Sequence, residues 1–126
     1  MNRRIAGRVA AALAGVALAA TGIFSLAAFD ARAQEYVTGP SVTMMDASYF
    51  PSQISIPADT GVVVPLSNWS VTQHDFVVPA LGVSSGSVMP GMASSVFLVT
   101  PAGAYEFICS IPGHKEAGMS GAIYAS

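Results

Sequence analysis

Charged residues and cysteines are scarce in this chain of 126 residues. Only 10% of the residues are charged, and the sequence contains one cysteine and two histidines. A single cysteine excludes an intrachain disulfide, a CxxC redox pair and a zinc site made of cysteines alone. The length is sufficient for one domain and too small for two. The fold must therefore be stabilised mainly by apolar burial.

Basic residues are nearly absent after residue 33. Four of the five lie within residues 1–33, and Lys115 alone stands against six acidic residues in 34–126, so that region has a formal charge of −5. A domain with so few cationic side chains cannot neutralise the phosphates of a nucleic acid. Nucleic-acid binding is therefore excluded.

The first 33 residues have the organisation of an export signal. Arginines near the N-terminus precede an apolar run, Val9–Phe29, and Ala31-Arg32-Ala33 has the small-x-small pattern of a signal-peptidase site. We therefore predict a signal peptide at 1–33, cleavage after Ala33, and a bacterial periplasmic domain at 34–126. The apolar run is also close to the ~20 residues that span a bilayer. An uncleaved membrane anchor is the alternative.

Residues 34–126 contain short β-branched and aromatic runs separated by Gly, Pro, Ser and Asn, without a helical pattern. Seven short strands at regular spacing in so small a chain indicate an all-β sandwich. The predicted strands are residues 42–46, 53–57, 62–67, 74–78, 95–100, 105–109 and 121–124.

Two of these strands direct a histidine and the cysteine inward. A period of two places Cys109 on the same face as Phe107, and His74 on the same face as Phe76. Buried imidazole and thiol groups need a partner or a function. Both residues are therefore candidates for a functional site.

The segment from Cys109 to Met119 supplies two more candidates, because it also contains His114. Together with His74, these residues offer two imidazoles, one thiolate and one thioether. A trigonal His₂Cys set with a weak axial Met is the arrangement of a blue-copper electron-transfer site. The sequence therefore predicts one copper ion per chain that alternates between Cu(I) and Cu(II).

Residues 34–126 resemble the cupredoxins, small blue-copper proteins such as plastocyanin, azurin and rusticyanin. The resemblance rests on residues 46–51, on residues 74–77 and on the Cys-x4-His-x4-Met loop, whose spacing is most similar to that of rusticyanin. It implies a Greek-key β-sandwich that shuttles single electrons and is not an enzyme. It also implies that His114 lies with its ring edge at the surface and serves as the electron port. The ligands implied by the resemblance are His74, Cys109, His114 and Met119.

A redox protein, such as a cytochrome or a copper or haem enzyme, is the expected partner of a monomeric chain. The acidic charge favours a basic face on that partner. Docking is expected near His114, among small and apolar residues: Pro79, Ala80, Leu81, Pro90, Gly91, Met92, Pro112 and Ala117.

Other chemistries fit these residues less well. A Cys–His hydrolase would need Cys109 exposed in a cleft. A binuclear copper centre would need a second cysteine at position 113, which is glycine, and a multicopper oxidase would need His-x-His pairs, which the sequence lacks. Zinc would need a better fourth ligand than methionine. The alternative that stays open is a periplasmic copper-binding or copper-delivery protein with the same fold.

Further expectations concern the residues next to the ligands, a glycosylation triplet and the remaining methionines. Asp75 follows His74 and Ser110 follows Cys109, so we expect the Asp75 side chain to hydrogen-bond Ser110 and its backbone N–H to approach the cysteine sulfur. Asn68-Trp69-Ser70 matches a glycosylation triplet, but bacterial export argues against its use. Four methionines are interpreted as core residues: Met44, Met45, Met89 and Met92.

Overall fold

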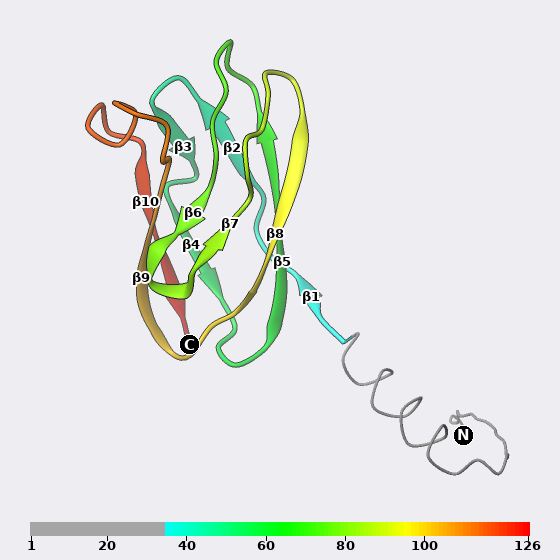
Figure 1. The fold of residues 1–126 in the computed structure, drawn as a ribbon. Helices are drawn as coiled ribbons and strands as arrows, with labels where there is room; N and C mark the ends of the chain where they lie inside the picture. Colours follow the sequence, from blue (N-terminus) through cyan, green and yellow to red (C-terminus); the bar gives the residue numbers. More distant parts are fainter. Residues whose placement is uncertain (1–34) are drawn as a thin grey trace, which may run out of the picture. The chain divides into compact units, whose positions relative to one another are not determined.

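The computed structural model describes residues 35–126 (Figure 1). The predicted signal peptide and its cleavage after Ala33 lie outside the described residues. Within the described part of the chain, no helix has the length and apolarity needed to cross a bilayer. Its regular structure consists of ten strands and one short 3₁₀ helix, η1 (Pro79–Leu81).

One sheet is built around the long strand β5 (Gly61–Asn68). Strand β8 (Ala93–Val99) pairs antiparallel with β5 along one edge. Strands β1 (Val37–Thr38) and β2 (Val42–Met45) pair parallel with successive parts of β5. Strand β3 (Ser48–Phe50) pairs antiparallel with β2 and ends the sheet.

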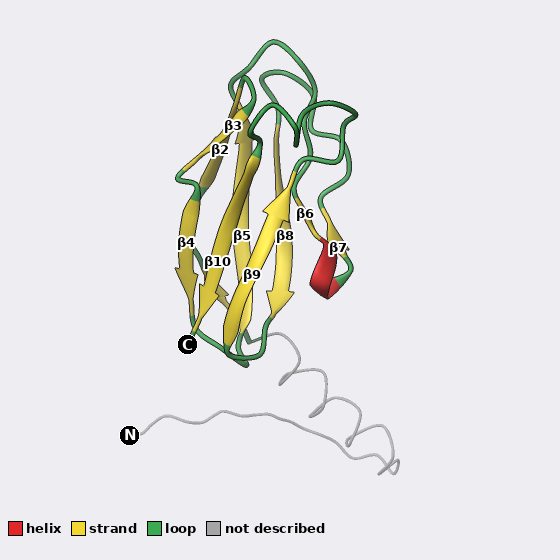
Figure 2. Cartoon of the chain, turned by 90° about the vertical axis from the view of Figure 1, so that its left-hand side faces the viewer, coloured by secondary structure: helices red, strands yellow, loops and turns green. Residues whose placement is uncertain are grey.

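The second sheet contains the strands on either side of the Cys109–Met119 segment. Strand β10 pairs parallel with β4 and antiparallel with β9. The two sheets face one another as a sandwich (Figures 1 and 2). This architecture confirms the predicted all-β fold. The strand order in this sheet is β4 (Gln53–Ile56), β10 (Ser120–Ala125), β9 (Gly103–Ile108), β6 (Val77–Val78) and β7 (Val83–Ser84).

The core lies between the sheets, and burial alternates along the strands that enclose it. In β5, Val62, Val64 and Leu66 are buried, while the residues between them are only half-buried, as expected for a strand with one inner face. Aromatic rings fill the space between the sheets. The rings of Phe76 and Phe107 are stacked with their centroids 4.5 Å apart.

Six of the seven predicted strands correspond to observed strands. The seventh, residues 74–78, is wrong over its first half. Only Val77 and Val78 form a strand there, whereas His74 makes an isolated bridge with Val88. Strands β1, β3 and β7 were not predicted, because two or three residues are too few for an alternating pattern to be recognised.

The interpretation of the methionines is correct for one residue and wrong for three. Met44 is fully buried, but Met45, Met89 and Met92 are 40%, 53% and 58% exposed. Met45 is exposed because it occupies an outward position in β2, one residue after the buried Met44.

Candidate metal centre

The cysteine and both histidines come from two segments that are distant in the sequence. Cys109 and His114 lie between β9 and β10, in the loop that Figure 1 shows at the end opposite the C-terminus. His74 lies between β5 and β6. Because Val77 pairs antiparallel with Ile108, the residues just before β6 run beside those just after β9. Sheet pairing therefore brings the two segments together.

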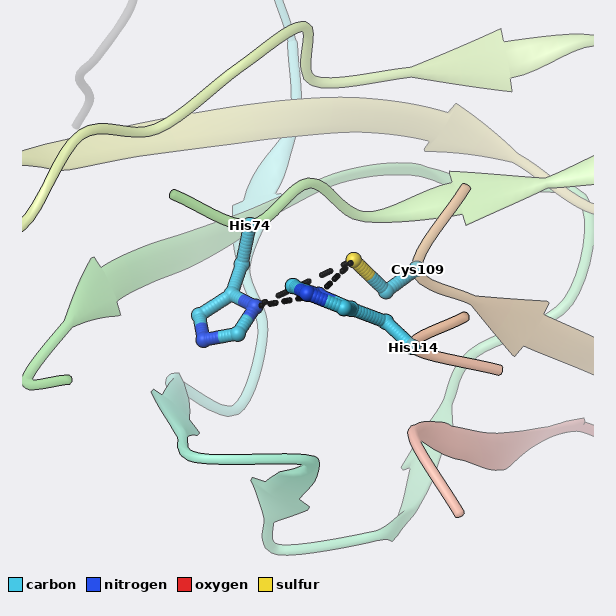
Figure 3. Close-up of side chains that lie close together, drawn as sticks. All are labelled: His74, Cys109 and His114. Atoms are coloured by element: carbon cyan, nitrogen blue, oxygen red, sulfur yellow. Dashed lines mark hydrogen bonds between the residues drawn. The ribbon is translucent and has the colours of Figure 1, made fainter. Parts of the chain in front are cut away.

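Three donor atoms from these side chains converge (Figure 3). The Nδ1 atoms of His74 and His114 are 3.1 Å apart. The Cys109 Sγ lies 3.5 Å from Nδ1 of His114 and 3.9 Å from Nδ1 of His74. Donor atoms that share one ion, with bonds of about 2.0–2.3 Å, lie roughly 3–4 Å apart. The structure thus has the predicted convergence, with Nδ1 of each histidine turned inward.

Met119 is fully buried at the end of the same loop. Its backbone N–H donates to the His114 carbonyl at 3.0 Å, and its carbonyl accepts the Cys109 N–H at 3.2 Å. These hydrogen bonds hold the Met119 backbone against both loop residues. That its thioether approaches the three donor atoms as an axial ligand stays a prediction.

Hydrogen bonds within the loop fix the position of His114. Its N–H donates to the Ile111 carbonyl at 3.0 Å, and its carbonyl accepts the Ala117 N–H at 3.1 Å. Gly118 has a φ of 111°, which L side chains rarely adopt. The glycine thus allows the chain to turn from the loop into Met119.

Asp75 ties the two ligand-bearing segments together. Its Oδ1 accepts the Ser110 backbone N–H at 2.7 Å, and its Oδ2 accepts the Ser110 hydroxyl. The predicted contact between these residues is therefore confirmed. A carboxylate that accepts two hydrogen bonds from one residue restricts how far the segments can separate.

The protein environment keeps the Cys109 sulfur protonated unless a cation is close. Burial raises the pKa of the thiol and the Asp75 charge adds to that rise, while the backbone N–H groups of Asp75 and Ile111 oppose it. That the Asp75 N–H approaches the sulfur closely enough for a hydrogen bond stays a prediction. Binding of a metal by this thiol must release a proton.

His74, in contrast, is held ready as a neutral ligand. Burial lowers the pKa of its imidazole, and the neighbouring His114 lowers it further, against the attraction of Asp46 and Asp75. Since an imidazole binds a metal only in its neutral form, the site favours the state of His74 that metal binding requires.

The donor set fits a soft or borderline metal ion better than a hard one. One thiol and two imidazoles suit copper or zinc, whereas Mg²⁺ and Ca²⁺ take oxygen ligands. Among the described residues, no fourth His, Cys, Asp or Glu joins the group. A tetrahedral zinc site would lack its usual fourth ligand. Copper with a weak axial thioether is the better match.

Two further residues contact the site, and the sequence did not indicate either of them. The Thr72 Oγ1 lies 3.3 Å from Nε2 of His74. The Tyr49 hydroxyl donates to the Asp75 carbonyl at 2.6 Å. Thr72 stands two residues before His74, a weak signal that could have identified it. Tyr49 is 26 positions from Asp75, and no local pattern connects them.

The expected apolar surroundings of His114 need a correction. Pro79, Ala80 and Leu81 form η1, which follows β6 and lies away from the loops at the site end (Figure 2). Strand β6 lies between His74 and these residues. Because it pairs antiparallel with β9, it carries the chain away from the site end.

The chain matches a family model described as a cupredoxin-like domain over residues 14–121. Solved structures share its fold. Reduced auracyanin from Roseiflexus castenholzii is 16% identical, with a TM-score of 0.64 over 73% of this chain and 98% of that chain. Auracyanin A, a "blue" copper protein from Chloroflexus aurantiacus, is 18% identical, with a TM-score of 0.59 over 70% and 100%. A multicopper oxidase is 14% identical, with a TM-score of 0.59 over 71% of this chain and 42% of the oxidase chain. No curated protein gives a significant sequence match.

Proposed function

The chain belongs to the cupredoxin-like domain family, and from that premise we propose that it binds one copper ion and carries single electrons between redox proteins. The observation on which this proposal rests is the convergence of two imidazole Nδ1 atoms and one thiol within 3.9 Å. This is the equatorial donor set of a blue-copper site.

Each residue has a distinct task in this proposal. His74, Cys109 and His114 would hold copper through two imidazoles and a thiolate, and Met119 would contribute its thioether. When bound, copper supplies the one-electron couple between Cu(I) and Cu(II). The protein's own contribution is to keep the donors in place in both oxidation states. The Asp75–Ser110 contacts and the hydrogen bonds within the loop do this.

Burial favours an electron carrier over the alternative, a copper-delivery protein. His74 and Cys109 are each 1% exposed, so an acceptor protein could not reach these two ligands without opening the fold. His114 is less buried than either. An electron can pass through the His114 ring while the other ligands stay covered.

The leader sequence and the acidic charge support a cellular compartment and a type of redox partner for the carrier. The leader sequence supports export to the periplasm. Residues 34–126 contain one basic and six acidic side chains. This charge favours a redox partner that docks near His114 with a basic face. Redox partners must separate after each transfer, so the contact area is expected to be small.

An absorption spectrum of the oxidised, copper-loaded protein tests the proposal. The wild type is expected to bind one copper per chain and to show an intense thiolate-to-copper band in the visible region. Cys109→Ser should remove the band, because a hydroxyl cannot replace the soft thiolate. A colourless Cu(II) complex of the wild type would refute the blue-copper assignment. Rapid loss of Cu(I) to an acceptor protein, without reversible reduction, would favour delivery.

A further inference from the structure

The segment that leads from β5 to His74 alternates polar and apolar residues in an unusual way. Asn68, Ser70 and Thr72 hydrogen-bond to one another. The apolar residues between them, Trp69 and Val71, are 75% and 83% exposed. Large apolar side chains are normally the ones turned inward. Here the polar side chains, with Asn68 fully buried among them, hold the segment by hydrogen bonds.

The Asn68 side chain is fully buried and uses both ends of its amide. Its Nδ2 donates to the Thr72 and Val88 carbonyls, each at 2.8 Å. Its Oδ1 accepts the N–H and the hydroxyl of Ser70, each at 2.9 Å. The amide nitrogen is thus unavailable for glycosylation in the folded protein, although the triplet matches the acceptor pattern.

Both carbonyls that accept hydrogen bonds from Asn68 lie next to the His74 backbone: one precedes it in the chain and the other pairs with it. The Val88 carbonyl also accepts the His74 N–H at 3.2 Å, and the Val88 N–H donates to the His74 carbonyl at 2.7 Å. The Thr72 carbonyl belongs to the residue two positions before His74. One buried side chain therefore holds both the segment that precedes the histidine and the segment that pairs with it.

Thr72 extends this network to the imidazole ring. Its backbone N–H donates to the Ser70 hydroxyl at 3.2 Å, and its Oγ1 lies 3.3 Å from Nε2 of His74. At that distance the hydroxyl can accept the Nε2 proton. A neutral imidazole with its proton on Nε2 has its lone pair on Nδ1, the atom that faces Cys109 and His114.

We propose that Asn68, Ser70 and Thr72 are positioning residues: the Asn68 amide fixes the His74 backbone, and the Thr72 hydroxyl fixes the tautomer that turns the Nδ1 lone pair toward the site. This proposal deepens the proposed function, because copper is the ion toward which Nδ1 is held. None of the three residues is proposed to be a ligand.

The first experiment measures the His74 tautomer in metal-free protein by long-range ¹H–¹⁵N NMR, at a pH where the imidazole is neutral. The wild type should show the Nε2–H tautomer alone. Thr72→Val removes the hydroxyl at nearly constant shape, and a second tautomer should appear. Thr72→Ser should restore the wild-type pattern. Thr60→Val is the matched control, because the Thr60 hydroxyl instead donates to the Ala58 carbonyl.

The second experiment follows hydrogen exchange of the His74 amide. Asn68→Asp keeps an oxygen for Ser70 but removes both N–H donors, and exchange of the His74 amide should become about tenfold faster or more. Thr60→Val should leave that amide unchanged. If Asn68→Asp fails to fold, Thr72→Val still decides the matter, because Thr72 is exposed and its change does not disturb the core.

The outcomes separate this proposal from the proposed function. A wild-type tautomer pattern in Thr72→Val would overturn the proposal that Thr72 fixes the His74 tautomer, even if the copper-loaded protein is blue. A tautomer change in Thr72→Val together with a colourless copper complex would support the network and overturn electron transfer. In a blue protein, Thr72→Val should also shift the reduction potential, while Thr60→Val should not.

Discussion

The Tyr49 hydroxyl donates to the Asp75 backbone carbonyl at 2.6 Å in the interior of the protein. Burial raises the pKa of Tyr49, and the nearby charges of Cys109 and Asp75 raise it further, so the phenol remains a neutral donor. Its ring centroid lies 4.8 Å from that of Phe107. Through this hydrogen bond, strand β3 holds the segment that carries His74. The Asp75 carboxylate in turn accepts the Ser110 N–H and connects this segment to the one that carries Cys109.

Tyr49→Phe should lower the free energy of unfolding by about 1–3 kcal/mol, because it leaves the buried Asp75 carbonyl without its donor. Urea denaturation of metal-free protein measures this change. Tyr105→Phe is the matched control, since the Tyr105 hydroxyl donates to the Pro101 carbonyl at an exposed position. Its cost should stay below about 1 kcal/mol. Equal costs for the two variants would contradict this account of Tyr49.

Asp75→Ala should destabilise the metal-free protein more than Ser110→Ala. The first change removes the acceptor of two hydrogen bonds, and the second removes only the hydroxyl donor. A double-mutant cycle should give a coupling energy of about 0.5–3 kcal/mol, as expected for residues in one hydrogen-bond network. Glu106→Ala, at an exposed position in β9, should stay within about 0.5 kcal/mol of the wild type. Additive effects of the two site variants would show that the contacts do not couple the segments.

Met119→Leu should leave copper bound and raise the reduction potential, because the axial donor sets the balance between the oxidation states. Met119→Gln should lower the potential, since an oxygen donor favours Cu(II). Voltammetry of the loaded protein measures both changes. Met45→Leu is the control, because Met45 is 40% exposed on β2 and lies outside the ligand loop. If neither Met119 variant changes the potential, Met119 is a packing residue and not a ligand.

The stability of the metal-free protein should fall on the acidic side of neutrality. The pKa of His74 is lowered from 6.5 in the folded state, so below that pH the unfolded chain binds the additional proton and unfolding becomes more favourable. The raised pKa of Cys109 acts in the other direction. Above pH 9.0 the unfolded thiol loses its proton first, so stability falls as the pH rises.

Urea denaturation of metal-free protein at a series of pH values tests this expectation. His74→Gln should reduce the acidic slope above about pH 5, where the carboxylates of the unfolded chain are already ionised. Cys109→Ser should reduce the alkaline slope just above pH 9.0. An unchanged acidic slope in His74→Gln would show that another group causes it.

Strands with one buried face were the most predictable part of the fold. Burial alternates along residues 62–67 and 105–109, and the inward direction of Cys109, which the period of two predicted from Phe107, is confirmed. Residues 74–76 broke the rule because all three are buried. There the chain leaves one sheet for the other, and each side chain finds a different partner.

The ligand group was predictable because few residues of the chain can bind a soft metal. With one cysteine and two histidines, their order and spacing left little choice. The supporting contacts of Tyr49 and Asn68 were not predictable. They join residues 26 and 20 positions apart, to Asp75 and Val88 respectively, and depend on a strand and a bridge that have no signal of their own in the sequence.

The exposed position of Trp69 makes the only tryptophan of the chain a reporter of surface contacts. Its indole already faces water in the native state, so unfolding should change the wavelength of its fluorescence little. It stands on the segment that leads to His74, beside a hollow lined by Met45 and Phe50. A protein that covers this part of the surface would dehydrate the indole and shift its emission to shorter wavelength, and titration without any attached dye would then follow the encounter.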